Sequence, residues 1–137
     1  MTFETDQDKL REKKAIETFV NVFNGSFKKL DPHDVDYKVF DKEKNLIAYV
    51  EVKGRNKTIR DAYPLPISVK KLIKLIDKRL TPVIIWACED GIIYGKAVNL
   101  VGQIKWGGRA TREGSFNDVE VMAYYDKQKE FKYVRYL

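Results

Sequence analysis

Residues 46–53 form an apolar run that ends in two opposite charges, Glu51 and Lys53. Successive side chains of a β-strand alternate between its two faces, so a strand here would project Glu51 and Lys53 to the same side. Charged groups at the end of a buried strand are costly, which indicates that they serve a purpose. The preceding strand-like stretch, residues 35–40, carries Asp36. Two adjacent strands would thus bring together two acids and a lysine, a combination suited to a divalent metal ion and water.

The Glu-x-Lys spacing occurs at three places in this lysine-rich chain, beginning at Glu12, Glu51 and Glu130. Glu12 lies in a predicted helix, where residues two apart do not face each other. Glu130 lies in a polar stretch near the end of the sequence, without an acid-bearing strand just before it. Only Glu51 closes an apolar strand that follows another strand carrying an acid. The alternative is a surface ion pair at a strand end, since such pairs are common and contribute little to stability.

The elements that would position these residues are predicted from periodicity and turn signals. Apolar residues at helical spacing predict helices from Thr5 to Phe23 and from Val69 to about Arg79, capped by Thr5 and Ser68. Strands are predicted at 35–40, 46–53, 83–88 and 92–96, with a last hairpin from 119–125 and 131–136. Residues 54–59 and 106–114 are predicted as loops.

This order of elements predicts a single α/β domain with a central mixed sheet flanked by helices. Its core would span about residues 5–98, and a β-hairpin extension would occupy about residues 99–137.

Composition narrows the function. The chain has 26 basic and 20 acidic residues among 137, which favours a polyanionic partner. One cysteine, Cys88, and one histidine, His33, exclude a disulfide framework, a CxxC zinc site and a two-histidine nuclease centre. The sequence contains neither a P-loop nor a GxGxxG motif, so we expect no small-molecule cofactor. Without a signal-peptide pattern or a bilayer-length apolar run, we expect a cytoplasmic protein that does not bind membranes.

Residues 35–55, VDYKVFDKEKNLIAYVEVKGR, resemble the PD-(D/E)xK nuclease superfamily, which includes many restriction endonucleases and archaeal-type Holliday junction resolvases. The resemblance covers about residues 5–96, because the preceding helix and the following helix and strand also agree. It implies a restriction endonuclease-like fold and a DNA endonuclease that uses Mg²⁺, with Mn²⁺ as a substitute. Val35 stands where the superfamily pattern has proline, and Asp34 has the same facing as Asp36. Either aspartate could therefore be the first metal ligand.

The resemblance implies a role for each residue of the site. Asp36, Glu51 and the backbone carbonyl of Val52 would hold the metal ion. Lys53 would orient or deprotonate the attacking water and offset phosphate charge. Glu17, on the preceding helix, would bind the metal ion through water or hold Lys53, and the alternative for it is a solvated helix acid.

Basic and polar residues outside the metal site are candidates for DNA contacts. Ser68 and Lys71 are one helical turn apart and share a face, although Ser68 could be a plain N-cap and Lys71 a solvated lysine. Two basic loops supply the other candidates: Arg55, Lys57, Arg60, Arg109 and Arg112. Trp106 and Phe116 lie near the last two and could stack on bases, but packing in the core is the more frequent role of a tryptophan.

Three functions are compatible with these residues. The first is a magnesium-dependent DNA endonuclease, which we expect to be selective for junctions or branched DNA and most simply a homodimer if it cuts both strands. The second is a catalytically silent module with a nuclease fold that binds nucleic acid or a partner protein, and an RNA-processing or interference protein of this fold is a third reading. A pure binder has no reason to keep acids facing phosphate, which favours the endonuclease.

Overall fold

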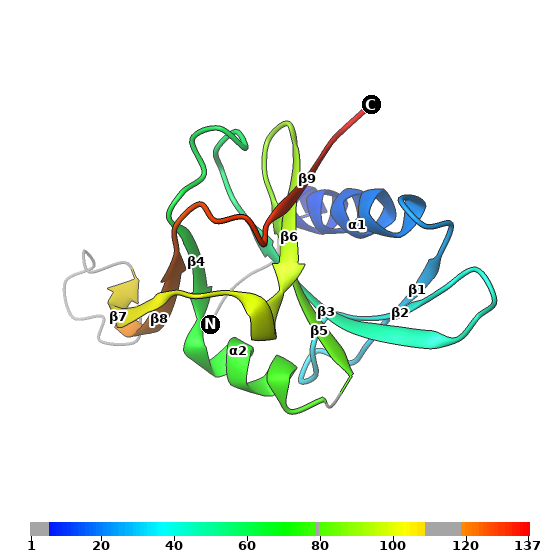
Figure 1. The fold of residues 1–137 in the computed structure, drawn as a ribbon, viewed down its shortest axis with the longest axis horizontal. Helices are drawn as coiled ribbons and strands as arrows, with labels where there is room; N and C mark the ends of the chain where they lie inside the picture. Colours follow the sequence, from blue (N-terminus) through cyan, green and yellow to red (C-terminus); the bar gives the residue numbers. More distant parts are fainter. Residues whose placement is uncertain (1–5, 79, 109–118) are drawn as a thin grey trace.

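The fold is given by a computed structural model, which describes residues 6–78, 80–108 and 119–137. In these ranges, two α-helices and a short 3-10 helix (Ala97–Asn99) accompany a six-stranded and a three-stranded sheet (Figure 1). The helices are α1 (Asp6–Asn21) and α2 (Val69–Ile76). The large sheet has the order β1 (Ser26–Lys29), β2 (Tyr37–Phe40), β3 (Leu46–Gly54), β5 (Thr81–Ala87), β6 (Gly91–Lys96) and β9 (Lys132–Arg135). The small sheet has the order β4 (Leu65–Ser68), β8 (Val119–Tyr125) and β7 (Gln103–Gly108).

The strand with the Glu-x-Lys motif, β3, lies inside the large sheet. It pairs antiparallel with β2 and parallel with β5, and the register places Glu51 opposite Ile84. A parallel pair needs a crossover connection, which β4 and α2 provide between β3 and β5. The mixed α/β sheet with flanking helices is therefore as predicted. Both strands of the 35–53 region form, but β2 begins at Tyr37, so Asp36 precedes this strand instead of lying in it as predicted.

The two faces of the large sheet are covered by different helices. Val50 and Val52 of β3 pack in one cluster with the buried side of α1, while Tyr49 packs against a second cluster that contains Leu75 of α2. Side chains of a strand alternate, so Glu51 and Lys53 lie on the α2 face together with Tyr49. Full burial of an aliphatic side chain contributes about 1.5–3 kcal/mol, so both clusters hold β3 firmly in place.

The C-terminal region differs from the prediction. Residues 119–125 and 131–136 do not form a hairpin, because β8 pairs with β4 and β7 in the small sheet while β9 pairs with β6 in the large one. Alternation identifies a strand but not its distant partner, which explains this error. Residues 106–108, predicted as a loop, lie in β7. A Cβ at Gly107 would overlap the hydroxyl group of Tyr124, so that side chain would have to move to admit any other residue.

One short strand and the ends of the helices also differ from the prediction. Strand β1 was not predicted, because its four residues include three that are exposed and follow a helix-ending Asn-Gly pair. Helix α2 ends at Ile76 with Asp77 as its C-cap, earlier than predicted, whereas Arg79 and the predicted cap Thr5 lie outside the described residues. Neither described α-helix is long and apolar enough to cross a membrane.

Candidate active site

Glu51 is buried in the middle of a sheet, with 4% of its surface exposed. Loss of hydration, together with the charge of the neighbouring Asp36 and a hydrogen bond to it, raises the pKa of its carboxyl group to about 9. At neutral pH Glu51 is therefore protonated in the metal-free protein, and its carboxyl O–H donates a hydrogen bond to Asp36. A cation bound between the two carboxyl groups would offset their mutual repulsion.

Asp36 reaches this position because it immediately precedes Tyr37, the residue at which the β2–β3 ladder ends. The last pair of the ladder joins Tyr37 to Val50, so Asp36 comes next to Glu51. Its Oδ2 accepts a hydrogen bond of 2.7 Å from the backbone N–H of Val52. The N–H and C=O of one strand residue point to the same side, so the carbonyl of Val52 is also directed toward Asp36. The three predicted metal ligands thus converge at one place.

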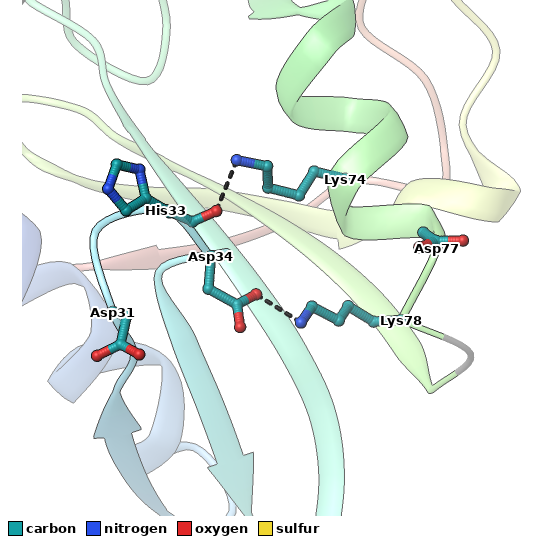
Figure 2. A pocket seen from close by; sticks show the side chains of 6 residues that line it. All are labelled: Asp31, His33, Asp34, Lys74, Asp77 and Lys78. Carbon is teal, nitrogen blue, oxygen red and sulfur yellow. Dashed lines mark hydrogen bonds and ion pairs between the residues drawn. The ribbon is translucent and has the colours of Figure 1, made fainter.

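The other aspartate considered from the sequence, Asp34, points toward Lys78, just beyond the end of α2. Its Oδ1 lies 2.5 Å from Nζ of Lys78, which together with the backbone N–H of Val35 lowers the pKa of Asp34. Figure 2 shows Asp34 pointing toward Lys78. Both residues line an open depression of about 350 Å³. The depression is lined by Asp31, His33, Asp34, Lys74, Asp77 and Lys78. Of the two candidates, Asp36 is therefore the one that lies beside Glu51.

Lys53 is partly exposed and follows Glu51 on the same face of β3, opposite Trp86 of β5. The predicted helix acid, Glu17, lies elsewhere. Its side chain is 48% exposed and its Oε1 is 3.9 Å from Nζ of Lys13. Glu17 is therefore a solvent-exposed acid of the helix, which was the alternative considered for it from the sequence.

A different glutamate of α1 lies at the site. The side chain of Glu12 is 12% exposed, and its Oε1 is 2.5 Å from Nζ of Lys29, which is in turn 3.5 Å from Oδ1 of Asp36. Burial raises the pKa of Glu12, and Asp36 adds to that rise. Position 12 precedes the buried Ala15 and Ile16 by three and four residues, so it belongs to the buried stripe of the helix. This spacing was the signal in the sequence that could have identified Glu12.

The residues predicted to contact DNA differ in the contacts that they make. Lys71 is exposed on α2, and its positive charge partly offsets the rise in the pKa of Glu51. Ser68 precedes α2 as predicted but makes no capping hydrogen bond, and its Oγ instead donates to Oε2 of Glu120 at 3.1 Å. Of this pair, Lys71 is therefore the residue whose charge influences Glu51.

The basic residues of the predicted loops also differ in their contacts and exposure. Arg55 donates from Nε to the carbonyl of Ala62 at 2.8 Å, so its guanidinium fastens its own loop. Lys57 and Arg60 are exposed. Trp106 is 73% exposed on β7, so the expectation that it is packed in the core is wrong. The remaining predicted residues, Arg109, Arg112 and Phe116, lie outside the described residues.

The donor set suits a partly hydrated magnesium ion. In the described part of the chain, no three His, Cys, Asp or Glu side chains are arranged to cage a metal ion by themselves. Magnesium does not need such a cage, because it keeps several waters and takes one or two carboxylates. Asp36 and Glu51, with the Val52 carbonyl directed to the same place, fit this requirement.

Comparison with known proteins identifies the family of the chain. A family model described as "Phage putative PDDEXK endonuclease" matches residues 1–134 and so includes every residue of the site. Neither the curated proteins nor the solved structures provided a match.

Proposed function

Since the chain belongs to this family of phage PDDEXK endonucleases, we propose that it is a metal-dependent DNA endonuclease whose centre is Asp36, Glu51 and Lys53. The observation that carries the proposal is the buried Glu51 carboxyl group held against Asp36. Burying a carboxyl beside another is unfavourable for folding alone, so its presence indicates a functional demand.

Each residue of the candidate site has a defined role in this proposal. Asp36 and Glu51 bind the ion, and the hydrogen bond from Val52 fixes the orientation of Asp36. A bound divalent ion lowers the pKa of its water and neutralises charge on the scissile phosphate. Lys53 lies on the same face as Glu51, where it orients the attacking water. Lys71, across from this face on α2, contacts a phosphate of the DNA.

A catalytically silent binding module is the second candidate, and the position of the acids argues against it. A surface that only holds phosphates gains from positive charge and loses from carboxylates close to the phosphate. In this chain Glu12, Asp36 and Glu51 all influence one another electrostatically. Such an acidic cluster beside Lys71 fits metal-assisted hydrolysis better than simple binding.

The proposal extends to the substrate and the assembly. We expect preferential cleavage of branched or junction DNA by a homodimer that cuts both strands. Cleavage of matched linear, nicked, flap and four-way junction DNA tests the first point, and the molar mass in solution tests the second.

Asp36→Asn and Lys53→Met provide the test of the site. Both variants should lose cleavage with Mg²⁺ and with Mn²⁺ while keeping the wild-type unfolding temperature within a few degrees. Cleavage at the wild-type rate by either variant, or no cleavage of any DNA by the wild type, would show that the assignment is wrong.

A further inference from the structure

A lysine from the edge strand β1 lies between two acids of the candidate site. Nζ of Lys29 is 2.5 Å from Oε1 of Glu12 and 3.5 Å from Oδ1 of Asp36. The ammonium also lies 4.8 Å from the centroid of the Tyr37 ring. Three elements, α1, β1 and the start of β2, therefore meet at this one positive charge.

The arrangement differs from an ordinary surface ion pair. The side chains of Glu12 and Asp36 are 12% and 20% exposed, whereas the side chain of Lys29 is 52% exposed. The two acids repel each other, because both carboxylates lie within 4 Å of the same ammonium and are therefore close together. A cation between them relieves this repulsion more effectively than one paired with a single solvated acid.

Asp36 is engaged at both of its oxygens. Oδ2 accepts the hydrogen bond from Val52, and Oδ1 faces the ammonium of Lys29. A divalent ion bound to Asp36 would share this carboxylate with a second cation only a few ångströms away, which electrostatic repulsion disfavours. The lysine stem is flexible and reaches solvent, so its ammonium can leave without disturbing the sheet.

We propose that Lys29 is a positioning residue, a built-in counter-ion that holds Glu12 and Asp36 in the metal-free protein and that the divalent ion displaces. This inference rests on the proposed metal site at Asp36 and Glu51. Lys29 thereby weakens metal binding and sets the metal concentration at which the site fills. The ligand concerned is a divalent cation, and no contact of Lys29 with DNA is required.

Isothermal titration calorimetry with Mn²⁺, without DNA, tests the proposal on the full chain. Lys29→Met keeps most of the aliphatic stem and removes the charge. It should bind Mn²⁺ about tenfold more tightly than the wild type, as expected when one repulsive positive charge is removed near a dication. Lys28→Met is the matched control, because Lys28 is an exposed neighbour on the same strand and its loss changes the net charge equally. Its Mn²⁺ affinity should stay at the wild-type value.

The outcomes separate this inference from the proposed function. If Lys29→Met and a second variant, Lys29→Gln, bind Mn²⁺ no more tightly than the wild type while Asp36→Asn abolishes binding, the metal site stands and the counter-ion role is wrong. If Lys28→Met tightens binding as much as Lys29→Met, the effect is one of net charge and the role is also wrong. If the wild type and all variants bind no Mn²⁺, the proposed metal site itself fails.

Discussion

Oδ2 of Asp36 accepts a hydrogen bond from the backbone N–H of Val52, with 2.7 Å between the two atoms. This bond joins the residue that precedes β2 to the middle of β3, at the point where the ladder between the two strands ends. It holds one acid against the next, because Glu51 immediately precedes Val52 in the strand. The pairing of the two carboxyl groups is therefore a consequence of the sheet register.

The first prediction concerns the pH dependence of stability in the presence of a chelator. Glu51 has a pKa of about 9 in the folded protein against an ordinary value of 4.5. A raised folded pKa stabilises the fold fully below pH 4.5, and this contribution is lost as the pH rises toward 9. At pH 8, Glu51→Gln should exceed the wild type in free energy of unfolding by about 1–3 kcal/mol.

Urea denaturation at a series of pH values measures this difference. Glu130→Gln serves as the control, since Glu130 belongs to another Glu-x-Lys triplet and should leave the pH profile unchanged. An equally steep fall in stability for Glu51→Gln would mean that Glu51 does not ionise with the proposed pKa.

The second prediction concerns stabilisation by metal. Mn²⁺ at a hundred times its dissociation constant should stabilise the wild type by about 2.7 kcal/mol, because a ligand of the folded state shifts the unfolding equilibrium. Thermal unfolding with Mn²⁺ and then with excess chelator measures the shift and its reversal. Asp36→Asn should show neither, and an equal shift in that variant would place the bound ion elsewhere.

The third prediction compares two glutamates of the same helix. Glu12→Gln should reduce the cleavage rate about 10–100-fold, the range found when a residue supporting metal ligands is lost. Glu17→Gln should cleave at the wild-type rate, because the Glu17 side chain is exposed and lies beside Lys13. Initial rates at saturating Mg²⁺ decide between them, and the reverse order of effects would restore Glu17 as the helix acid of the site.

The fourth prediction concerns the phosphate contact of Lys71. Lys71→Ala should weaken DNA binding similarly for all sequences and reduce the salt dependence of log K by about one phosphate contact. Fluorescence anisotropy with Ca²⁺ in place of Mg²⁺, from 50 to 200 mM salt (roughly the range in which phosphate contacts are resolved), provides the slope. Lys70→Ala, at the exposed preceding position of α2, is the control. Equal slopes for the wild type and Lys71→Ala would remove Lys71 from the interface.

The local part of this structure could be predicted from the sequence. Alternation within residues 46–53 placed Glu51 and Lys53 on one face, and the turn before them brought Asp36 alongside. The distant part could not be predicted in this way, since nothing in the alternation of residues 119–125 identifies β4 as a partner. The exposure of Trp106 could not be predicted for the same reason. Trp106 lies on β7, an edge strand of the small sheet, and this sheet was not expected from the sequence.

The helix acid was missed for a different reason. Glu17 lies next to the apolar stripe of α1, whereas Glu12 lies on it, and only the three-dimensional position of Lys29 shows what Glu12 does there. Lys29 itself lies on a short, exposed strand whose four residues carry no strong β pattern. A charged residue on a buried stripe, as at position 12, was the more reliable signal.

Cleavage of plasmid and junction DNA with Mg²⁺ by the wild type, Glu51→Gln and Glu130→Gln tests the central claim most directly. The variants make the same Glu-to-Gln substitution in two Glu-x-Lys triplets, of which only the first lies beside Asp36. We predict that the wild type and Glu130→Gln cut at equal rates and that Glu51→Gln loses cleavage at least about a hundredfold. Equal cleavage by Glu51→Gln and the wild type would contradict a metal-dependent active site at this strand.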